Sequence, residues 1–448
     1  GAPDVVLRRC TKVRTDKGDV PLTDEWREKI LAQNKAMADN ALRVMAAART
    51  NWGKEEPKSY DADFLEHDMT FLGLSGMIDP VRPEVKDAIA EAHGAGMRVV
   101  MITGDHIDTA VAIARELGII QSRAQAITGA ELDKISDEEF EHKIEDIGVY
   151  ARVQPEHKTR IVDMWKKKGM VVAMTGDGVN DAPSIKRADI GVGMGITGTD
   201  VTKGVADMVL ADDNFATIIG AVEEGRRIYD NIRKAIQFLL SSNLAEVVVV
   251  FIASLIGFTI LEPTHLLWIN LITDSLPALA MCMEAAEPDI MKRKPRNSHD
   301  GIFAGGMGAD CIFQGVVISV ITLISYFLGI SAEGVSVAQA VASDEAGIEG
   351  MTMAFLTLSM LEMFHSFNMR SRRASLFQLP TQNVWTWGAF ALSLVLTYIV
   401  IETPLSVVFG FVELDAFHYL VAFGLSVLII PIVELYKVIM RRVEKVQA

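Results

Sequence analysis

The sequence predicts an α/β domain with a parallel sheet, followed by an all-α bundle of six transmembrane helices. Two observations predict this fold class. Strand-like and helix-like segments alternate through residues 1–237, whereas long apolar runs fill residues 238–440. The mean hydropathy of +0.25 is high for a soluble protein and comes from the second part. The chain therefore joins a soluble domain to a membrane domain.

The composition of the 448 residues excludes several classes of protein. A hydrophobic share of 50% and a charged share of 23% exclude a disordered chain. The net charge of −15, from 43 basic and 58 acidic residues, predicts that no nucleic acid is bound. Three scattered cysteines form neither a disulfide framework nor a zinc site.

The soluble part contains repeated strand-to-helix units. Each strand-like run is rich in apolar residues, ends in a turn, and leads into a helical pattern, which favours a parallel sheet covered on both faces. Ligands of such sheets bind beyond the carboxyl ends of the strands. The runs and the helices that follow them are 98–105 with 106–117, 149–153 with 155–168, 170–177 with 181–188, and 190–195 with 199–207.

Two of these strands end in Thr-Gly-Asp, at 103–105 and 175–177. Ordinary turns and helix caps are the alternative interpretation, because Thr and Asp are common there. Asp177 and Asp181, however, flank a short Gly-Val-Asn turn and suit Mg²⁺ beside a phosphate. Lys158 at the start of a helix supplies a compensating charge. The pattern predicts a phosphoryl-transfer site whose nucleophile is missing, with Thr103 and the Gly104 amide as hydrogen-bond donors.

Six apolar runs in the second part each have about 20 residues, enough to cross the hydrocarbon core of a bilayer. Lys and Arg follow the second and fourth runs and the last one, whereas the intervening loops contain neither residue. The positive-inside rule therefore places the soluble part and the C-terminus in the cytoplasm. The predicted spans are 238–258, 264–283, 311–330, 350–369, 384–402 and 417–438.

Polar and acidic residues inside these spans predict a cation site, because such groups are costly in a membrane. Their helical spacing puts the residues of each span on one face, and Pro277 is expected to disturb its helix and free backbone carbonyls. Three carboxylates with amide and hydroxyl oxygens suit Ca²⁺ better than a soft metal. Interhelical hydrogen bonding is the structural alternative. The candidate ligands are Asn243, Glu246, Asn270, Thr273, Asp274 and Glu362.

Several segments resemble the signature motifs of P-type ATPases: "MITGD", "ARVQPEHK" and "MTGDGVNDAP", with the hinge-like "GLSGMIDPVRPEV" at 73–85. The resemblance implies a haloacid-dehalogenase-like (Rossmann-like) phosphorylation domain and an ATP-driven pump that uses Mg²⁺. It divides the chain into the end of a nucleotide-binding domain (1–78), the phosphorylation domain (79–215), a stalk helix (216–237) and the membrane domain (238–440). It also implies a nucleotide-binding set of Arg43, Thr103, Gly104, Asp105, Arg152, Lys158 and Asn180.

The family's phosphorylated aspartate lies in an Asp-Lys-Thr-Gly-Thr motif, and this sequence contains no such string. The family pattern also places the actuator domain's Thr-Gly-Glu loop and the first four spans before the segment that begins at Gly1, and this sequence contains neither. The resemblance therefore implies the C-terminal half of a pump, inactive alone, whose partners are ATP, the transported ion, membrane lipid and the missing N-terminal half.

"SSNLAEVV" and "WINLITDSLPA" resemble the calcium pumps of sarcoplasmic-reticulum type. That resemblance implies Ca²⁺ as the transported ion, with a pump for Na⁺, K⁺ or Mn²⁺ as the alternative. A membrane-anchored haloacid-dehalogenase-like phosphatase and a passive channel are the other hypotheses. The first does not explain the intramembrane carboxylates, and the second does not explain Lys158, Asp177 and Asp181. Short outer loops indicate a bacterial plasma membrane, with an internal eukaryotic membrane as the alternative.

Overall fold

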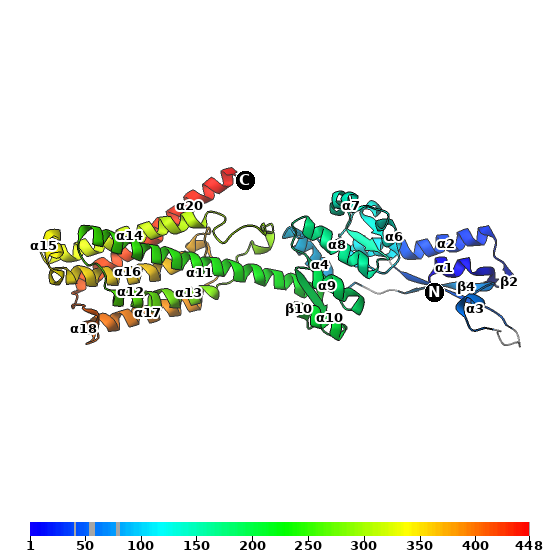
Figure 1. Ribbon diagram of the computed structural model, residues 1–448, viewed down its shortest axis with the longest axis horizontal. Helices are drawn as coiled ribbons and strands as arrows, with labels where there is room; N and C mark the ends of the chain where they lie inside the picture. The colour runs from blue at the N-terminus through cyan, green and yellow to red at the C-terminus, as the bar shows by residue number, and fades with distance from the viewer. Residues whose placement is uncertain (40–41, 53–58, 78–80, 448) are drawn as a thin grey trace. The chain divides into compact units, whose positions relative to one another are not determined.

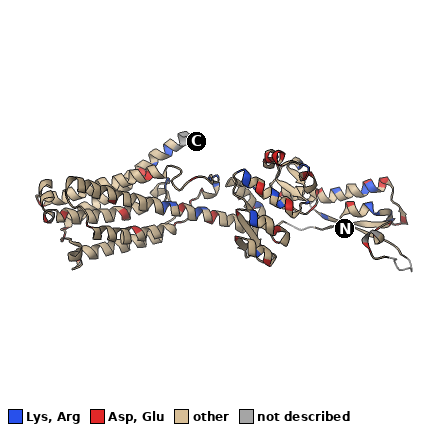
Figure 2. Ribbon diagram, viewed as in Figure 1, with Lys and Arg blue, Asp and Glu red and all other residues tan. Residues whose placement is uncertain are grey.

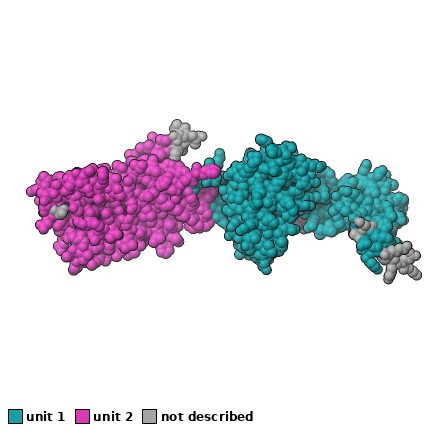
Figure 3. Space-filling model, viewed as in Figure 1, with its two compact units in different colours: residues 1–222, 291–298 teal, residues 223–290, 299–448 magenta. Residues whose placement is uncertain are grey.

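The structure is a computed structural model that describes residues 1–39, 42–52, 59–77 and 81–447. The chain forms two compact units, shown in Figure 3. Unit 1 comprises residues 1–222 and 291–298, and unit 2 comprises residues 223–290 and 299–448. The predicted domain boundary between residues 78 and 79 lies outside the described residues.

Figure 1 labels most of the elements. The strands are β1 Cys10–Thr15, β2 Gly18–Pro21, β3 Arg43–Arg49, β4 Met69–Met77, β5 Met101–Thr103, β6 Ala126–Thr128, β7 Val149–Ala151, β8 Ala173–Gly176, β9 Ile190–Met194 and β10 Met208–Leu210. The helices of unit 1 are α1 Pro3–Arg8, α2 Asp24–Asp39, α3 Ala62–Leu65, α4 Pro83–Gly94, α5 Ile107–Glu116, α6 Gly129–Leu132, α7 Asp137–Lys143, α8 Pro155–Lys167, α9 Ala182–Arg187 and α10 Asp200–Val205. The remaining helices are α11 Phe215–Ile256, α12 Pro263–Trp268, α13 Ser275–Cys282, α14 Met307–Ala332, α15 Val337–Ala342, α16 Ile348–Asn368, α17 Val384–Glu402, α18 Ser406–Phe409, α19 Ala416–Val427 and α20 Ile429–Gln447.

The first part of unit 1 is a four-stranded mixed sheet in the order β2-β1-β4-β3. β1 and β2 form an antiparallel hairpin, β1 runs parallel to β4, and β3 is antiparallel to β4. Leu7 of α1 and Ile30 of α2 pack with Val13 and Phe71 of the sheet in one apolar core. The short α1 and the longer α2 therefore cover this sheet.

The rest of unit 1 contains two three-stranded parallel sheets, in the orders β5-β7-β6 and β10-β9-β8. The sequence predicted a parallel sheet covered on both faces, and the structure divides its strands between two sheets. Among the described residues β5 pairs only with β7, and β8 pairs only with β9, so each has one unpaired edge. α8 nevertheless covers both sheets, because its residue Val162 packs in one cluster with Ile102 of β5 and Met174 of β8. The two sheets therefore share an apolar core, although no hydrogen bonds join β5 to β8 among the described residues.

Unit 2 is a helical bundle in which charged residues are sparse (Figure 2). The described residues include five helical segments that are long and apolar enough to cross a membrane: Phe215–Ile256, Pro263–Cys282, Met307–Ala332, Val384–Glu402 and Ala416–Val443. They overlap five of the six predicted spans. The predicted stalk 216–237 and the predicted span 238–258 form one uninterrupted helix, α11.

The remaining predicted span, 350–369, coincides with α16, which has 21 residues and is not among those five segments. Nearly every residue of α16 from Gly350 to Asn368 is buried. α14 packs closely against it: a Cβ added at Gly329 of α14 would lie 2.9 Å from the Cα of Gly350. The hydroxyl groups of Ser325 and Thr357 are 2.6 Å apart across the same contact. α16 is therefore a central helix of the bundle, surrounded by protein.

Candidate functional site

The carboxyl end of β8 carries the longer of the two Thr-Gly-Asp segments. The chain passes from Gly176 through a 3₁₀ turn at Val179–Asp181 into α9. Asp181 is buried, and its Oδ1 accepts a hydrogen bond of 2.5 Å from the Nζ of Lys158. Its Oδ2 accepts a hydrogen bond of 3.1 Å from the backbone N–H of Gly178. Both oxygens of this carboxylate are therefore held by the protein.

Gly176 makes this arrangement possible. A Cβ added at residue 176 would lie 2.4 Å from the Cβ of Asp181, which is far inside van der Waals contact. The buried carboxylate of Asp181 thus occupies the space that any other side chain at position 176 would need. Glycine is required here by close approach of the neighbouring turn.

Lys158 reaches Asp181 from the first turn of α8, which begins at Pro155. His157 fixes the start of this helix, because its Nδ1 accepts a hydrogen bond of 2.9 Å from the backbone N–H of Gln154. The Nε2 atom of the same ring lies 2.8 Å from the Oδ1 of Asp133. The ammonium group of Lys158 is therefore presented by a helix terminus that is itself held in place.

Asp177 differs from Asp181, although the sequence paired them. Its side chain is exposed, and no hydrogen bond or ion pair joins its carboxylate to another residue in the described part of the chain. Its carbonyl oxygen, in contrast, accepts a hydrogen bond of 2.9 Å from the backbone N–H of Thr199. The backbone of Asp177 is anchored while its carboxylate stays free to bind a cation such as Mg²⁺, which prefers oxygen ligands.

The loop that anchors Asp177 is in turn held by Asp213. The Asp213 carboxylate accepts hydrogen bonds of 3.0 and 2.7 Å from the backbone N–H groups of Ile196 and Thr197. These bonds, led by the one from Ile196, lower the pKa of Asp213 to about 2. Because the folded-state pKa is depressed, this contribution to stability is present above the ordinary aspartate range and is lost as the pH falls through about 2.

The other Thr-Gly-Asp segment lies at the carboxyl end of β5. The Thr103 hydroxyl donates a hydrogen bond of 2.9 Å to Oδ2 of Asp105, and Gly104 is exposed. Arg152 has a left-handed backbone, with φ of 50°, and its N–H donates to the carbonyl of Asp105 at 3.2 Å. Since Ile102 and Met174 share one apolar cluster, the residues just after them lie at neighbouring strand ends. The carboxyl ends of β5 and β7 therefore bring four candidate residues together: Thr103, Gly104, Asp105 and Arg152.

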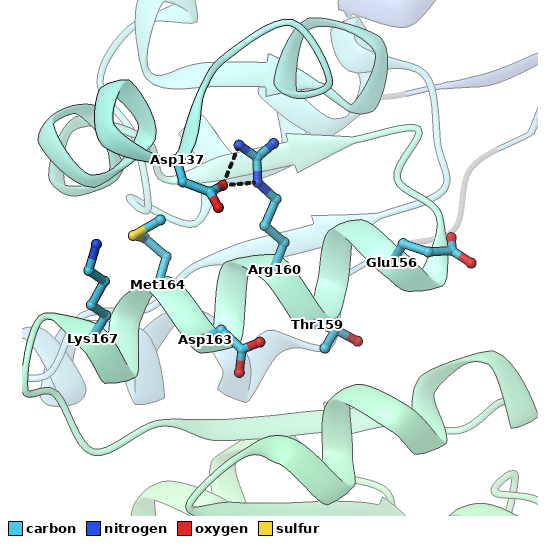
Figure 4. A pocket seen from close by; sticks show the side chains of 7 residues that line it. All are labelled: Asp137, Glu156, Thr159, Arg160, Asp163, Met164 and Lys167. Atoms are coloured by element: carbon cyan, nitrogen blue, oxygen red, sulfur yellow. Dashed lines mark hydrogen bonds and ion pairs between the residues drawn. The ribbon is translucent and has the colours of Figure 1, made fainter.

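Two residues of the predicted nucleotide-binding set stand apart from these contacts. Asn180 is exposed in the 3₁₀ turn, and Arg43 begins β3 in the four-stranded sheet. A pocket of about 480 Å³ in unit 1 coincides with neither of them (Figure 4). α8 contributes most of its lining, including Arg160, which bonds Asp137, and Lys167, which bonds Glu141. Because these cations are already paired, the pocket is no ready anion site.

Unit 2 brings three carboxylates together inside the bundle. Glu246 of α11, Asp274 and Glu362 of α16 each offer an oxygen within 4.8 Å of the others. All three are buried, and Asp274 and Glu362 are completely inaccessible. In the described part of the chain no ion pair joins a Lys or Arg to any of them. We call Glu246, Asp274 and Glu362 the carboxylate triad.

Neutral polar groups complete the surroundings of the triad. The Asn270 amide donates hydrogen bonds of 3.0 and 2.9 Å to the two oxygens of Glu246. The Thr273 hydroxyl donates a hydrogen bond of 2.8 Å to Oε2 of Glu362. Both oxygens of Asp274 and Oε1 of Glu362 are buried without a hydrogen-bond donor among the described residues. Like charges this close require a bound cation or protons, so these orphaned oxygens fit a hard cation.

The backbone beside Asp274 departs from a regular α-helix. Residues Ile269–Asp274 form a π-helical segment between α12 and α13. Pro277 follows, and it cannot donate a hydrogen bond to the carbonyl of Thr273 four residues earlier. A π-helical turn is a common response to such an interruption and frequently marks a functional site. The helix disturbance expected at Pro277 is thus found in the preceding segment, Ile269–Asp274. This π-helical segment contains the candidate ligands Asn270, Thr273 and Asp274.

Asn243 is the candidate ligand that the structure does not bring to the triad. Its side chain is exposed on α11 and donates a hydrogen bond of 2.7 Å to the carbonyl of Leu239. Val247 and Phe251, which follow on the same side of α11, are 65% and 60% exposed. Asn243 therefore belongs to an outward stripe of the helix, whereas Glu246 points into the bundle.

Comparison with curated proteins finds relatives along nearly the whole chain. "Calcium-transporting ATPase 1" of Bacillus cereus is 46% identical over 441 residues, covering 97% of this chain and 49% of that protein. "Calcium-transporting ATPase" of Bacillus subtilis is 42% identical, covering 95% of this chain and 47% of that protein. "Endoplasmic reticulum calcium ATPase srcA" of Aspergillus fumigatus is 36% identical, covering 99% and 49%. The chain thus spans about half the length of the curated relatives it matches.

Two family models match as well. "P-type ATPase, cytoplasmic domain N" matches residues 1–84, and "Cation transporting ATPase, C-terminus" matches residues 258–439. The chain belongs to the P-type ATPases. The described residues of this P-type ATPase chain include five helical segments long and apolar enough to cross a membrane, so the chain is a multi-pass membrane protein. The matched models cover the first part of unit 1 and most of the bundle that holds the triad.

Sequence reasoning missed several residues that make structural contacts near the two candidate sites or elsewhere in the two units of this P-type ATPase. His157 was passed over although it stands next to Lys158, and Asp213 was passed over although it organises the loop beside Asp177. Glu284 and Arg370 form a buried ion pair in unit 2 with an N–O distance of 2.8 Å. A charged residue directly after an apolar span was the available signal for this pair, but such residues are usually solvated.

Proposed function

We propose that this chain is the C-terminal half of an ATP-driven calcium pump that works through an aspartyl-phosphate intermediate. The observation that carries the proposal is the carboxylate triad inside the bundle of a P-type ATPase. Three of its buried oxygens, both of Asp274 and Oε1 of Glu362, accept no hydrogen bond from the described residues. The relatives that carry calcium transport in their names support the choice of ion. The phosphorylated aspartate, which this chain lacks, would come from the N-terminal half.

Ca²⁺ fits the ligand set better than the alternatives. Ca²⁺ takes six to eight oxygen ligands in flexible geometry, whereas soft metals prefer thiolates. The candidate ligand atoms are all oxygens, from the side chains of Glu246, Asn270, Thr273, Asp274 and Glu362. Three carboxylates also supply more negative charge than one monovalent ion needs. We therefore favour Ca²⁺ over Na⁺, K⁺ and Mn²⁺ as the transported ion.

Lys158, Asp177, Asp181 and Thr103 would form the phosphoryl-transfer site. Asp181 orients Lys158 through their 2.5 Å contact, so that the ammonium faces the incoming phosphoryl group. Asp177, whose carboxylate is unpaired among the described residues, would hold Mg²⁺ with support from Asp181. Mg²⁺ would neutralise charge on the transferred group. Arg43, Gly104, Asp105, Arg152 and Asn180 remain the proposed nucleotide contacts, through which this half would bind ATP.

The open edges of β5 and β8 support a haloacid-dehalogenase-like domain completed by another segment. Parallel sheets are normally covered and continuous, and an unpaired edge strand is a site for strand addition. α8 already packs against both edges through Val162. We propose that a strand from the N-terminal half pairs between β5 and β8 and carries the phosphorylated aspartate to the carboxyl ends where Thr103 and Asp177 lie.

The same proposal accounts for the membrane domain. α16, which carries Glu362, would be the sixth span, buried by its neighbours. The outward stripe of α11 would contact spans of the N-terminal half, because an amide such as Asn243 is costly against lipid. Those spans would bring Asn243 into the cation site and supply further ligands. The bacterial relatives support location in a bacterial plasma membrane, with unit 1 in the cytoplasm.

ATP-driven ⁴⁵Ca²⁺ uptake by the complete protein in proteoliposomes tests the proposal. Uptake is expected with Mg²⁺ and ATP, and a calcium ionophore should release the accumulated ion. Acid-stable phosphoenzyme formed only in the presence of Ca²⁺ is the second expected result. Accumulation of Na⁺, K⁺ or Mn²⁺ without Ca²⁺ would contradict the choice of ion. ATP hydrolysis without any ion movement would favour the membrane-anchored phosphatase.

Lys158→Ala in the complete protein is expected to slow phosphorylation. Loss of a fixed charge that stabilises the transition state should lower the single-turnover rate by about a hundredfold, with a much smaller effect on ATP affinity. Rapid-quench labelling with [γ-³²P]ATP measures the rate, and nucleotide titration measures the affinity. Lys167→Ala is the matched control, because Lys167 lies on the same helix but pairs with Glu141 at the surface. If Lys158→Ala weakened only ATP binding, the proposed role would be wrong.

A further inference from the structure

Glu284 and Arg370 form a charge pair that is buried deep in unit 2, with only 4% and 2% of the two residues exposed. Nη2 of Arg370 donates to Oε1 of Glu284 at 2.8 Å, and Nε donates to Oε2 at 3.1 Å. The two parallel bonds make a bidentate contact, which fixes both distance and orientation. Neither residue belongs to the carboxylate triad or to the phosphoryl site.

Neighbouring segments satisfy the remaining hydrogen-bonding groups of the pair. Arg370 also donates to the carbonyl of Thr381 at 2.6 Å. Asn383 donates to Oε2 of Glu284 at 2.9 Å and to the carbonyl of Ala280 at 3.0 Å, while its own Oδ1 caps α17. Asn231 of α11 donates to the carbonyl of Glu284 at 2.8 Å. The pair therefore ties the ends of α13 and α16 to the start of α17 and to α11.

Stability alone is a weak reason for such a pair. Burying two charges is costly, and apolar side chains of similar volume are often equally stabilising or better. A bidentate ion pair fixes the distance and orientation of its two residues, which an apolar contact does not. The role of this pair is therefore better judged from the segments that it joins than from its contribution to stability.

Glu284 and Arg370 lie just beyond the carboxyl ends of α13 and α16, the helices that follow Asp274 and carry Glu362. Asp274 precedes α13 and stands ten residues before Glu284, and Glu362 of α16 stands eight residues before Arg370. At 1.5 Å per residue each charge lies about 12 to 15 Å along the chain from its ligand. The π-helical segment and Pro277 interrupt the regular helix between them, so α13 needs a second point of attachment to hold its alignment with α16.

We propose that the Glu284–Arg370 pair sets the alignment of α13 with α16 and thereby the affinity of the carboxylate triad for its cation. Glu284 and Arg370 are positioning residues, because they act through the helices and do not touch the ion. The alignment that the pair would maintain is marked by the hydrogen bond of 2.8 Å from the Thr273 hydroxyl to Oε2 of Glu362. This inference rests on the proposed cation site and adds a determinant of its affinity.

The test compares variants of the complete protein by equilibrium ⁴⁵Ca²⁺ binding and by thermal unfolding. Arg370→Lys keeps the charge and removes the fork, and we expect a folded protein with about tenfold weaker binding, a size typical of coupling between distant sites. The double variant Glu284→Met/Arg370→Met removes both charges together, and we expect near-normal thermal stability with similarly weakened binding. Arg373→Lys is the matched control, because Arg373 contacts Asp310 of α14 in place of Glu284.

The double variant keeps the inference falsifiable even where a single substitution prevents folding. Wild-type affinity in a folded double variant would overturn the inference, because the pair would then serve packing alone. Equal weakening in the Arg373→Lys control would also overturn it, by showing a general effect of the loop after α16. Wild-type protein that binds no Ca²⁺ would contradict the proposed function itself, whereas normal wild-type binding with unaffected variants would contradict this inference alone.

Discussion

Asp274→Asn is expected to abolish Ca²⁺-activated phosphorylation of the complete protein and to weaken Ca²⁺ binding by about a hundredfold or more, since ligand charge tunes Ca²⁺ affinity over several orders of magnitude. Asp274 is central to the triad: it is fully buried, and neither of its oxygens has a donor among the described residues. Its carboxylate is thus the group most available to a cation. Equilibrium ⁴⁵Ca²⁺ binding and phosphoenzyme labelling measure the two effects.

Folding provides an internal control for this variant. A buried carboxylate at membrane depth costs roughly 2.5–3.5 kcal/mol, so the amide should leave the thermal stability unchanged or raise it. Glu362→Gln should have a milder effect on binding, because water can replace one ligand in a flexible Ca²⁺ shell. Undiminished Ca²⁺ binding by folded Asp274→Asn protein would refute the assignment of the triad as the transport site.

Asp177→Ala is expected to reduce phosphoenzyme formation by about a thousandfold or more, because the metal that the carboxylate would hold neutralises the transferred phosphoryl group. Structural damage should be small, since the Asp177 side chain is exposed and the loop is anchored by its backbone through Thr199. Labelling with [γ-³²P]ATP across a range of Mg²⁺ concentrations measures the loss, and high Mg²⁺ should restore part of it.

Asp163→Ala is the matched control for Asp177→Ala. Asp163 is also an aspartate of the same unit, but it pairs with Arg187 at the surface of α8, at 2.6 Å. Its removal should leave phosphoenzyme levels near those of the wild type, because exposed ion pairs contribute little. Phosphoenzyme at wild-type levels in Asp177→Ala, at millimolar Mg²⁺, would exclude Asp177 as the principal metal ligand.

The surroundings of the carboxylate triad show how much of the candidate site the sequence predicts. Spacing of three and four residues put Asn270, Thr273 and Asp274 on one face of a span, and the structure places all three beside Glu246 or Glu362. The helical spacing of Asn243 and Glu246 alone does not determine which way the Asn243 side chain points. A separation of three residues leaves two side chains about 60° apart around a helix. That difference is enough for Glu246 to point inward while Asn243 bonds back to the carbonyl of Leu239.

The soluble part was harder to predict for a different reason. Strand-to-helix alternation indicates a parallel sheet, but each strand forms hydrogen bonds with partners that are distant in sequence, as β5 does with β7. Nothing in the runs 98–105 and 170–177 reveals that β5 and β8 lack a partner on one side among the described residues. Contacts such as that of His157 with Asp133 were hidden for the same reason, because 24 residues separate the two side chains.

The burial of α16 constrains how the membrane domain is made. A segment that contains Glu362 and His365 and is less apolar than its neighbours partitions poorly into lipid as a single helix. α14 is synthesised earlier and presents Ser325 and Gly329, which α16 contacts through Thr357 and Gly350. If α16 is a span, we expect it to insert together with α14, because packing against α14 would shield Glu362 from lipid. A defect on the α14 face that carries Ser325 and Gly329 would then leave the Glu362 carboxylate facing lipid, at a cost of several kcal/mol.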